Sequence, residues 1–324
     1  MHSKTGFKIL ATPTSFKPDG ISDALTALKE FAGEIVFNPT GKPLPERELI
    51  RLLDGCDGVI AGLDPFNANV IGACAGKLKV ISRYGSGYDN VDIAAARERG
   101  ITVCYAPGAN SQAVADLTFG LMIGVARKIP ALDRKTKAGE WTRSVGTELY
   151  RKTLGIVGLG AVGKAVTQRA QGFSMRILAY DPAPDRGFAA ANGVIETSFH
   201  ELLASSDFIS LHLPLNENTR HIINRDALQM IKPGAILINT ARGGLVDETA
   251  AYGALISGRL GGIGLDAYET EPPGFSPLFG LDNAILMPHT GSHTAEAITA
   301  LADISVRNLI EALSGIPCKN AVSI

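Results

Sequence analysis

Short apolar runs alternate with amphipathic stretches along the first third of the chain. The runs occupy residues 7–12 (FKILAT), 34–39 (EIVFNP), 58–62 (GVIAG), 78–83 (LKVISR) and 101–105 (ITVCY). Strands buried on both faces of a parallel sheet read as near-continuous apolar runs, and helical segments connect them. The pattern therefore predicts a parallel α/β sheet.

The same alternation restarts near the middle of the chain. The second series occupies residues 153–160 (TLGIVGLG), 176–181 (RILAYD), 207–214 (DFISLHLP), 235–241 (AILINTA), 262–268 (GIGLDAY) and 284–289 (AILMPH). A length of 324 residues suits two domains. The sequence therefore predicts two doubly wound α/β units in one chain.

Two further segments have the apolar spacing of helices. Residues 110–141 are predicted to form one long, mostly buried helix, because apolar residues recur along it at Val114, Leu117, Leu121, Ile123 and Val125. Residues 294–315 are predicted to form an amphipathic helix that begins after Thr294. A threonine at that position can cap the helix, since its hydroxyl accepts a hydrogen bond from a free backbone N–H.

Composition narrows the class of protein. Hydrophobic residues make up 45% and charged residues 19% of the chain, and the net charge is −1. This balance suits a soluble enzyme and argues against nucleic acid as a partner. No secretion signal or long apolar span is evident, so we expect no membrane association and a cytoplasmic location. The cysteines are too widely spaced to signal a zinc site or a disulfide framework, and free thiols are expected at Cys56, Cys74, Cys104 and Cys318.

A glycine motif opens the second α/β series. Gly158, Gly160 and Gly163 follow a predicted strand and begin a helix, and Asp181 ends the next strand 18 residues after Gly163. Such glycines permit a tight turn, close approach of the backbone to a pyrophosphate, and close packing of helix and strand. The carboxylate at the next strand end suits the ribose hydroxyls of NAD, which is therefore the favoured cofactor. Arg186 lies five residues after Asp181 and could bind the additional phosphate of NADP, so the sequence predicts a preference for NAD and does not exclude NADP.

Four chemically active residues follow later strands of the same unit. They are Arg242, Asp266, Glu271 and His289. Ligands of doubly wound folds bind outside the carboxyl ends of the strands. Each residue alone has an ordinary structural explanation, but together they suit hydride transfer to a 2-oxo acid. An arginine can hold the carboxylate of the substrate, a histidine can protonate its oxygen, and a carboxylate can support the charged histidine.

His289 and His293 are four residues apart, the spacing of a metal pair on one helix. However, Pro288 and Gly291 place His289 in a loop, ahead of the helix that starts near Thr294. No third ligand is suitably spaced to complete a zinc site. We therefore predict no metal, assign the proton to His289, and regard His293 as a polar residue that the chemistry does not require.

The motifs RYGSGYDNVD, GLGAVG, NTARGG, LDAYETEPP and PHTG occur in this order. With them the chain resembles the D-isomer-specific 2-hydroxyacid dehydrogenases, in particular the D-3-phosphoglycerate dehydrogenase-like branch, from about residue 80 to residue 297. The resemblance implies an NAD-dependent oxidoreductase with Arg242, Glu271 and His289 as its catalytic residues. It also implies a Rossmann NAD-binding domain (104–290) inserted into a flavodoxin-like substrate domain (1–103 and 291–324).

The resemblance also implies two sets of binding residues. Ser86 and Gly87 would offer backbone N–H groups to the substrate carboxylate, and Asp266 would accept the carboxamide of the cofactor. The substrate set is Arg83, Gly85, Ser86, Gly87, Arg242 and His289. The cofactor set is Gly158, Gly160, Ala161, Val162, Gly163, Asp181, Leu213, Pro214, Thr219, Thr240, Ala241, Asp266 and Gly291.

The resemblance further implies a homodimer formed through the cofactor domain and residues 110–141. Two residues depart from the family pattern: Asp116 stands where glutamate is usual, a difference expected to affect only packing or an interface, and Gly62 lies where members acting on 3-phosphoglycerate commonly carry a nearby arginine. The nearest cations that could take the place of this arginine are Arg83 and, if it reaches a neighbouring site, Arg143. At this length we expect no additional regulatory domain.

Three functions remain open from the sequence. The first is a D-2-hydroxyacid dehydrogenase, with 3-phosphoglycerate as one candidate substrate. The second is a glyoxylate or hydroxypyruvate reductase, which the absence of an arginine near Gly62 favours. The third, more distant alternative is an NAD-sensing protein like the corepressors that share the fold. A sensor would bind NADH without appreciable turnover.

Overall fold

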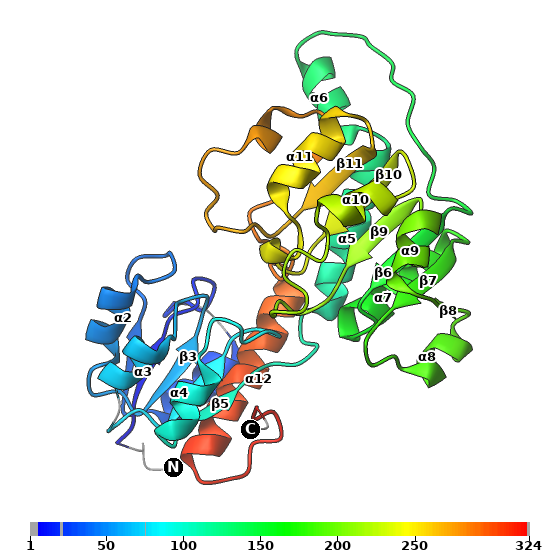
Figure 1. Cartoon of the computed structure of the whole chain (residues 1–324). Coiled ribbons are helices and arrows are strands. Elements are labelled where there is room, and N and C mark those ends of the chain that lie inside the picture. The colour runs from blue at the N-terminus through cyan, green and yellow to red at the C-terminus, as the bar shows by residue number, and fades with distance from the viewer. Residues whose placement is uncertain (1–5, 20–21, 75, 323–324) are drawn as a thin grey trace. The chain divides into compact units, whose positions relative to one another are not determined.

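The computed structural model describes residues 6–19, 22–74 and 76–322. The chain forms two compact units (Figure 1), the first made of residues 1–110 and 294–324 and the second of residues 111–293. The boundaries that the resemblance implies are 103/104 and 290/291. Both ends of the chain therefore belong to the first unit, and the second is inserted between them.

The first unit contains a five-stranded parallel sheet in the order β2-β1-β3-β4-β5. This is the flavodoxin-like order. The strands are β1 (Lys8–Ala11), β2 (Glu34–Phe37), β3 (Gly58–Ala61), β4 (Val80–Arg83) and β5 (Thr102–Cys104). Each lies inside one of the apolar runs of the first series, as predicted.

Helices cover both faces of this sheet. They are α1 (Asp23–Phe31), α2 (Glu46–Leu53), α3 (Ala68–Ala73), α4 (Ile93–Glu98) and α12 (Ala295–Leu313). One apolar core includes residues of α2, α3 and α4. The other joins α1 to α12. The predicted terminal helix is confirmed, and the Thr294 side chain accepts a hydrogen bond from Ala297 N at 3.1 Å as its N-cap.

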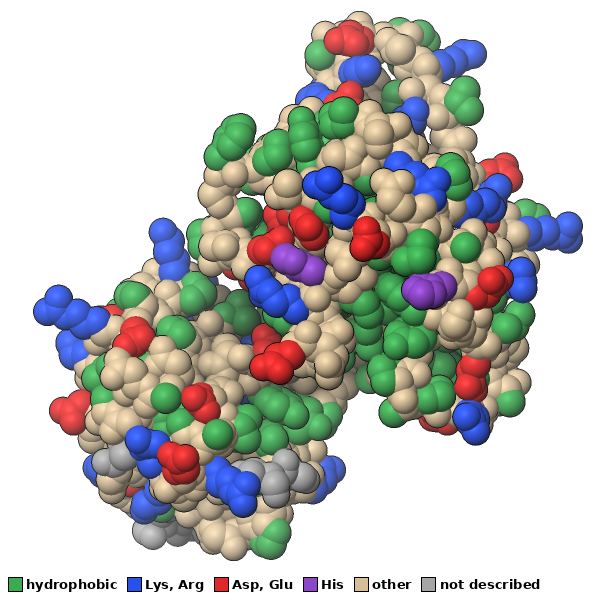
Figure 2. Space-filling view, viewed as in Figure 1, with side chains coloured by type: hydrophobic (Ala, Val, Ile, Leu, Met, Phe, Trp, Pro, Cys, Tyr) green, Lys and Arg blue, Asp and Glu red, His purple; other side chains and the backbone are tan. Residues whose placement is uncertain are grey.

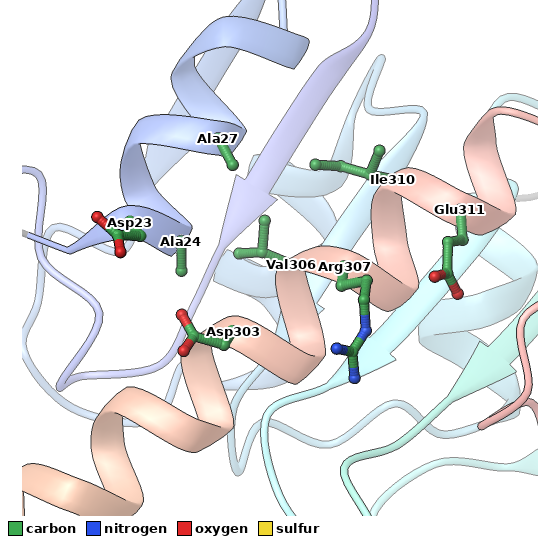
Figure 3. Close-up of a pocket in the computed structure, with 8 residues that line it drawn as sticks. All are labelled: Asp23, Ala24, Ala27, Asp303, Val306, Arg307, Ile310 and Glu311. Carbon is green, nitrogen blue, oxygen red and sulfur yellow. The ribbon is translucent and has the colours of Figure 1, made fainter.

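A surface cavity of about 320 Å³ lies between α1 and α12 (Figure 3). Its apolar lining comes from Ala24, Ala27, Val306 and Ile310, and its charged lining from Asp23, Asp303, Arg307 and Glu311. The apolar side chains lie between the two helices, whereas Arg307 and Glu311 extend away from α1. None of them belongs to the sets of site residues identified in the sequence.

The second unit contains a seven-stranded parallel sheet in the order β12-β11-β10-β9-β6-β7-β8. The strands are β6 (Thr153–Val157), β7 (Arg176–Tyr180), β8 (Ile195–Glu196), β9 (Phe208–Leu211), β10 (Ala235–Asn239), β11 (Leu260–Leu265) and β12 (Ala284–Leu286). This is the Rossmann order with β12 added at the far edge. The predicted fold class is therefore confirmed, although the two-residue strand β8 was not foreseen.

The helical segments of this unit pack on both sides of its sheet. They are α5 (Ser111–Ala126), α6 (Ile129–Lys137), α7 (Ala161–Gly172), α8 (Arg186–Ala191), α9 (Phe199–Ser205), α10 (Arg225–Met230) and α11 (Glu248–Ile256), with the 3₁₀ turns η1 (Gly243–Leu245) and η2 (Pro277–Gly280). None of the helices in the described part of the chain combines the length and the apolar character needed to cross a bilayer.

The prediction of a single helix over residues 110–141 is wrong. Helix α5 ends at Ala126, and α6 begins only at Ile129. Lys128 between them has a φ of 55°, which a right-handed helix does not accommodate. Pro130 in the first turn of α6 lacks the N–H that a continuous helix would need. The buried apolar spacing belongs to α5, whereas most residues of α6 are exposed.

Replacing Thr294 with alanine should lower the free energy of unfolding by about 1 kcal/mol, because Ala297 N would lose its capping acceptor. Urea unfolding followed by circular dichroism would measure the change. Thr299→Ala is the matched control, since the Thr299 hydroxyl donates only to Ala295 O within the helix and alanine favours helix. Equal stability of the wild type and Thr294→Ala would contradict the capping role.

Candidate functional site

The sheet order of the second unit brings the candidate residues into one row. His289 follows β12, Asp266 follows β11 and Arg242 follows β10, while Gly158 follows β6. These strands are parallel, and β12, β11, β10, β9 and β6 are successive neighbours. Because the carboxyl ends of parallel strands share one edge of the sheet, all four residues lie along that edge.

Each glycine of the motif has its own structural requirement. Gly158 has a φ of 101°, and a Cβ there would lie 2.7 Å from the backbone of His212. At Gly163 a Cβ would lie 2.1 Å from the carbonyl oxygen of Gly158, so only glycine lets α7 pack this closely. A Cβ on Gly160 would meet nothing within 4 Å. Gly160 is the N-cap of α7, whose first N–H groups suit a pyrophosphate.

Asp181 organises the glycine loop from the end of β7. One of its carboxylate oxygens accepts a hydrogen bond from Leu159 N at 2.6 Å, and the other accepts one from Ala183 N at 2.8 Å. The side chain therefore lies beside the loop that Gly158 and Gly160 form. This is the place where the sequence reading put an acceptor for ribose hydroxyls.

Arg242 is positioned by the end of β10. Asn239 is fully buried, and its side-chain amide donates to Arg242 O at 2.7 Å while its amide oxygen accepts from Ala241 N at 3.1 Å. The guanidinium Nη1 donates to Ala241 O at 2.8 Å. Packing fixes the next residue too, because a Cβ on Gly243 would lie 1.8 Å from the carbonyl carbon of Tyr268. The arginine backbone therefore has little freedom.

Asp266 holds the loop that carries the histidine. Its carboxylate is 2% exposed and accepts hydrogen bonds from Thr290 N and Gly291 N, each at 2.7 Å. Burial raises the pKa of Asp266, although the two N–H groups act in the opposite direction. Both carboxylate oxygens thus accept hydrogen bonds from backbone N–H groups.

His289 and Glu271 form a pair. His289 Nδ1 lies 2.7 Å from Glu271 Oε2, and both side chains are about one-third exposed, at 28% and 32%. The other carboxylate oxygen of Glu271 accepts from Tyr268 N at 3.1 Å. Burial opposes ionisation of Glu271, but the hydrogen bond from His289 and the charges of His289 and Arg242 hold its pKa below the ordinary value. The structure thus brings together three residues identified from the sequence.

A second group of side chains braces the loop around Glu271. Glu269 N donates to Glu248 Oε1 at 2.7 Å, and Glu248 N donates to Glu269 Oε1 at 3.3 Å. His221 Nε2 lies 3.3 Å from Glu269 Oε2. Figure 2 shows acidic and histidine side chains gathered on this unit. Sequence reasoning missed this brace, because its members come from three separate segments.

The predicted substrate loop lies in the first unit. Ser86 Oγ hydrogen-bonds to Asn110 Oδ1, and Gly85 O accepts from Ala106 N at 2.9 Å. Arg83 is 5% exposed, and its guanidinium donates to Asn90 Oδ1 at 3.0 Å and to Tyr84 O at 2.5 Å. A Cβ on Gly85 would lie 2.7 Å from this guanidinium, so the loop closes over it. Gly87 is half-buried in the same loop.

The remaining predicted cofactor residues also lie in the second unit. Thr219 Oγ1 donates to Pro214 O at 2.7 Å and closes the loop after β9, next to buried Leu213. Thr240 Oγ1 pairs with Thr118 Oγ1 at 2.9 Å, which ties β10 to α5. The others occupy the first turn of α7, the segment after β10 and the loop held by Asp266; they are Ala161, Val162, Ala241 and Gly291.

Two residues questioned in the sequence have clear positions. His293 is exposed just before the cap of α12, with His293 N donating to Thr290 O at 2.8 Å. Asp116 on α5 pairs with Arg169 on α7 at 2.6 Å. The departure from glutamate at residue 116 therefore lies in a helix contact within the second unit.

Sequence reasoning missed His212, which follows β9 directly. Its Nε2 hydrogen-bonds to Ser210 Oγ at 2.8 Å, whereas Nδ1 is buried with no hydrogen-bond partner in the described part of the chain. Burial lowers the pKa of His212 to about 3. The motif DFISLHLP contains this histidine, but only the fold reveals that its backbone packs against Gly158.

Comparison with known proteins places these residues in context. A family model described as D-isomer specific 2-hydroxyacid dehydrogenase, NAD binding domain, matches residues 119–291. The chain is 42% identical over 304 residues to D-3-phosphoglycerate dehydrogenase of Methanocaldococcus jannaschii, which covers 93% of this chain and 57% of that protein. It is 41% identical to glyoxylate reductase of Korarchaeum cryptofilum, with 83% of each chain covered.

A solved structure agrees over nearly the full length. Glyoxylate reductase from Paecilomyes thermophila has a TM-score of 0.86 at 32% identity and covers 98% of both chains. Our chain thus spans little more than half of the phosphoglycerate dehydrogenase named above, but nearly all of this reductase.

The buried His212 should make stability depend on pH. The unfolded chain binds a proton at this imidazole below its ordinary pKa of 6.5, whereas the folded protein does so only near pH 3. The free energy of unfolding should therefore fall as the pH decreases from about 6.5, with a slope of at most about 1.4 kcal/mol per pH unit. His212→Asn should flatten this slope in urea unfolding between pH 7 and 5. The exposed His200→Asn is the control, and identical slopes for wild type and His212→Asn would refute the assignment.

Proposed function

The chain belongs to the D-isomer-specific 2-hydroxyacid dehydrogenases, NAD-dependent oxidoreductases that act on CH–OH groups, and from this premise we propose that it interconverts a 2-oxo acid and the corresponding D-2-hydroxy acid. The family, enzyme class and cofactor predicted from the sequence are confirmed by this membership. The observation that carries the proposal is the contact of 2.7 Å between His289 and Glu271, on the strand edge that also carries Arg242 and the glycine motif.

The residues at the glycine motif fit NAD. A Cβ on Gly160 would occupy otherwise open space, which leaves the backbone at the start of α7 accessible to a pyrophosphate. The Asp181 carboxylate beside this loop suits the ribose hydroxyls of NAD and disfavours the phosphate of NADP. When bound, NADH supplies the hydride that reduces the 2-oxo acid.

The remaining steps belong to the side chains of this protein. The Arg242 guanidinium binds the substrate carboxylate and polarises the adjacent carbonyl. His289 donates its Nε2 proton to the carbonyl oxygen, while its Nδ1 is held by Glu271. The Glu271 charge stabilises the imidazolium and fixes the ring. The resemblance further assigns to Ser86 and Gly87 backbone N–H groups that bind the substrate carboxylate. Their loop packs against the guanidinium of Arg83.

The surroundings of Gly62 favour a small, unphosphorylated substrate such as glyoxylate or hydroxypyruvate. Gly62 follows β3, and a Cβ there would lie 3.1 Å from the carboxylate of Asp64 and 3.2 Å from Thr12 Oγ1. Asp64 is fully buried and accepts from Leu44 N at 2.6 Å. The segment around Gly62 carries no arginine, the side chain best suited to neutralise a phosphate, and the nearby Arg83 guanidinium is buried and donates to Ala61 O at 3.3 Å and Tyr84 O at 2.5 Å.

We also propose a homodimer formed through the second unit. The segment after α6 exposes two large apolar side chains, Trp141 at 86% and Val145 at 91%. An exposed tryptophan is typical of surfaces that a partner covers.

A cytoplasmic location fits the composition of the chain, and fractionation of the cells that produce it would test the location.

Replacing His289 with alanine should reduce kcat by about two to four decades, the effect of losing a positioned acid, and should leave NADH affinity nearly unchanged. Glu271→Gln should reduce kcat by at least about tenfold, since a neutral amide no longer stabilises the imidazolium. Steady-state kinetics and NADH fluorescence titration would separate the two effects. His293→Ala, exposed four residues away, is the control, and normal turnover of His289→Ala would exclude it as the proton donor.

A substrate panel tests the choice of acid. We expect kcat/KM with NADH to be higher for glyoxylate or hydroxypyruvate than for phosphohydroxypyruvate by at least about tenfold, because the segment around Gly62 carries no arginine to neutralise a phosphate. The same panel with NADPH tests the Asp181 assignment. A preference for phosphohydroxypyruvate would refute the substrate proposal alone, whereas NADH binding without turnover of any 2-oxo acid would refute the enzymatic one.

A further inference from the structure

Two cysteines far apart in the sequence lie together in the first unit. Cys104 is the last residue of β5 and is fully buried. Cys318 lies in the segment after α12 and is half-buried. Cys318 lies close enough to Cys104 to raise the pKa of the Cys104 thiol, after the larger effect of burial. The spacing of the cysteines along the chain gives no sign of this pair, because it arises only when the C-terminal segment returns to the sheet.

Backbone contacts fix the approach of this segment. Ala321 forms an antiparallel bridge with Cys104. On either side of the bridge, Tyr105 N donates to Asn320 O at 3.2 Å, and Val322 N donates to Val103 O at 2.8 Å. A turn closed by Ala321 N and Cys318 O, at 3.1 Å, joins Cys318 directly to this bridge. The path of the main chain therefore keeps Cys318 close to Cys104.

Side chains fasten the same segment to the start of the connection that leads to the second unit. Asn308 on α12 donates to Tyr105 O at 2.8 Å and accepts from Asn320 Nδ2 at 2.9 Å. The following residue, Ala106, donates its N–H to Gly85 O at 2.9 Å. The hydrogen bonds that hold the C-terminal segment against β5 are thus directly followed along the chain by the bond from Ala106 N to Gly85 O.

We propose that Cys104 and Cys318 form a redox-active dithiol that closes to a disulfide when a peroxide oxidises the protein. The half-exposed Cys318 thiol attacks the peroxide, giving a sulfenic acid and one molecule of water. The Cys104 sulfur then attacks the Cys318 sulfur, the sulfur–oxygen bond breaks, and a second water leaves as the disulfide forms. The two thiols lose two electrons and the peroxide gains them; an external dithiol reverses the process.

The other thiols are poor competitors for the oxidant. Burial raises the pKa of Cys56 to about 11, and its Sγ donates to Leu52 O at 3.3 Å. Burial also raises the pKa of Cys74. Cys104 itself has a raised pKa, first because it is buried and then because of Cys318. Since the thiolate is the reactive form, oxidation should begin at Cys318.

The test is to treat the folded chain with a few equivalents of hydrogen peroxide and then map its thiols under denaturing conditions. Free thiols should fall from four per chain to two. Trypsin should release a disulfide-linked pair of peptides, residues 100–127 with residues 308–319, which dithiothreitol separates. Hydrogen exchange of residues 318–322 should slow in the oxidised protein. This test does not depend on the proposed enzymatic function.

Cys318→Ser should abolish the linked pair and retain three free thiols, while Cys74→Ser, the matched half-buried control, should still form it. Cys56 and Cys74 share one tryptic peptide, residues 52–77, so a mispaired product is recognised directly. The proposal is overturned if Cys318 becomes a sulfinic acid while Cys104 still titrates as a thiol, if either cysteine links instead to residues 52–77, or if no linkage forms.

Discussion

The two hydrogen bonds that Asp266 accepts are the constraint on which the site depends. A carboxylate that is 2% exposed is costly to bury unless its oxygens have donors, and here the donors are Thr290 N and Gly291 N. They reach the carboxylate only if the chain after β12 turns sharply. His289 therefore adopts a φ of 52°, a left-handed backbone that histidine rarely takes. That turn presents its Nδ1 to Glu271.

Glu271 in turn depends on a close backbone contact on the other side of the site. Gly243 packs so tightly against Tyr268 that no side chain fits between them, and Tyr268 N binds the carboxylate of Glu271. The loop after β11 is therefore fixed relative to the loop that carries Arg242. The reciprocal bonds between Glu248 and Glu269 hold the same loop from α11. Displacing the backbone at Gly243 or Tyr268 would therefore move Glu271 as well.

The sequence allowed the sheets and much of the site to be predicted, because local patterns encode them. Parallel strands are continuous apolar runs, and Gly158 and Gly163 stand where the neighbouring backbone leaves no room for a side chain. The break at Lys128, the exposed α6 and the pairing of Cys104 with Cys318 were missed, since the first depends on one local backbone conformation and the last on segments more than 200 residues apart. Asp266 is identified in the sequence as a candidate site residue, but its backbone donors cannot be predicted from residue types alone.

The candidate catalytic residues and the loop at Gly85 lie in different units. Arg242, Glu271 and His289 all belong to the second unit, together with the glycine motif. Their mutual geometry is therefore set by one sheet and its loops. The loop at Gly85 and the position of Gly62 belong to the first unit, where the buried Arg83 and Asp64 shape the backbone. No hydrogen bond of the Glu271 and His289 pair described above involves a residue of the first unit, so substitutions there remove none of the contacts that hold this pair.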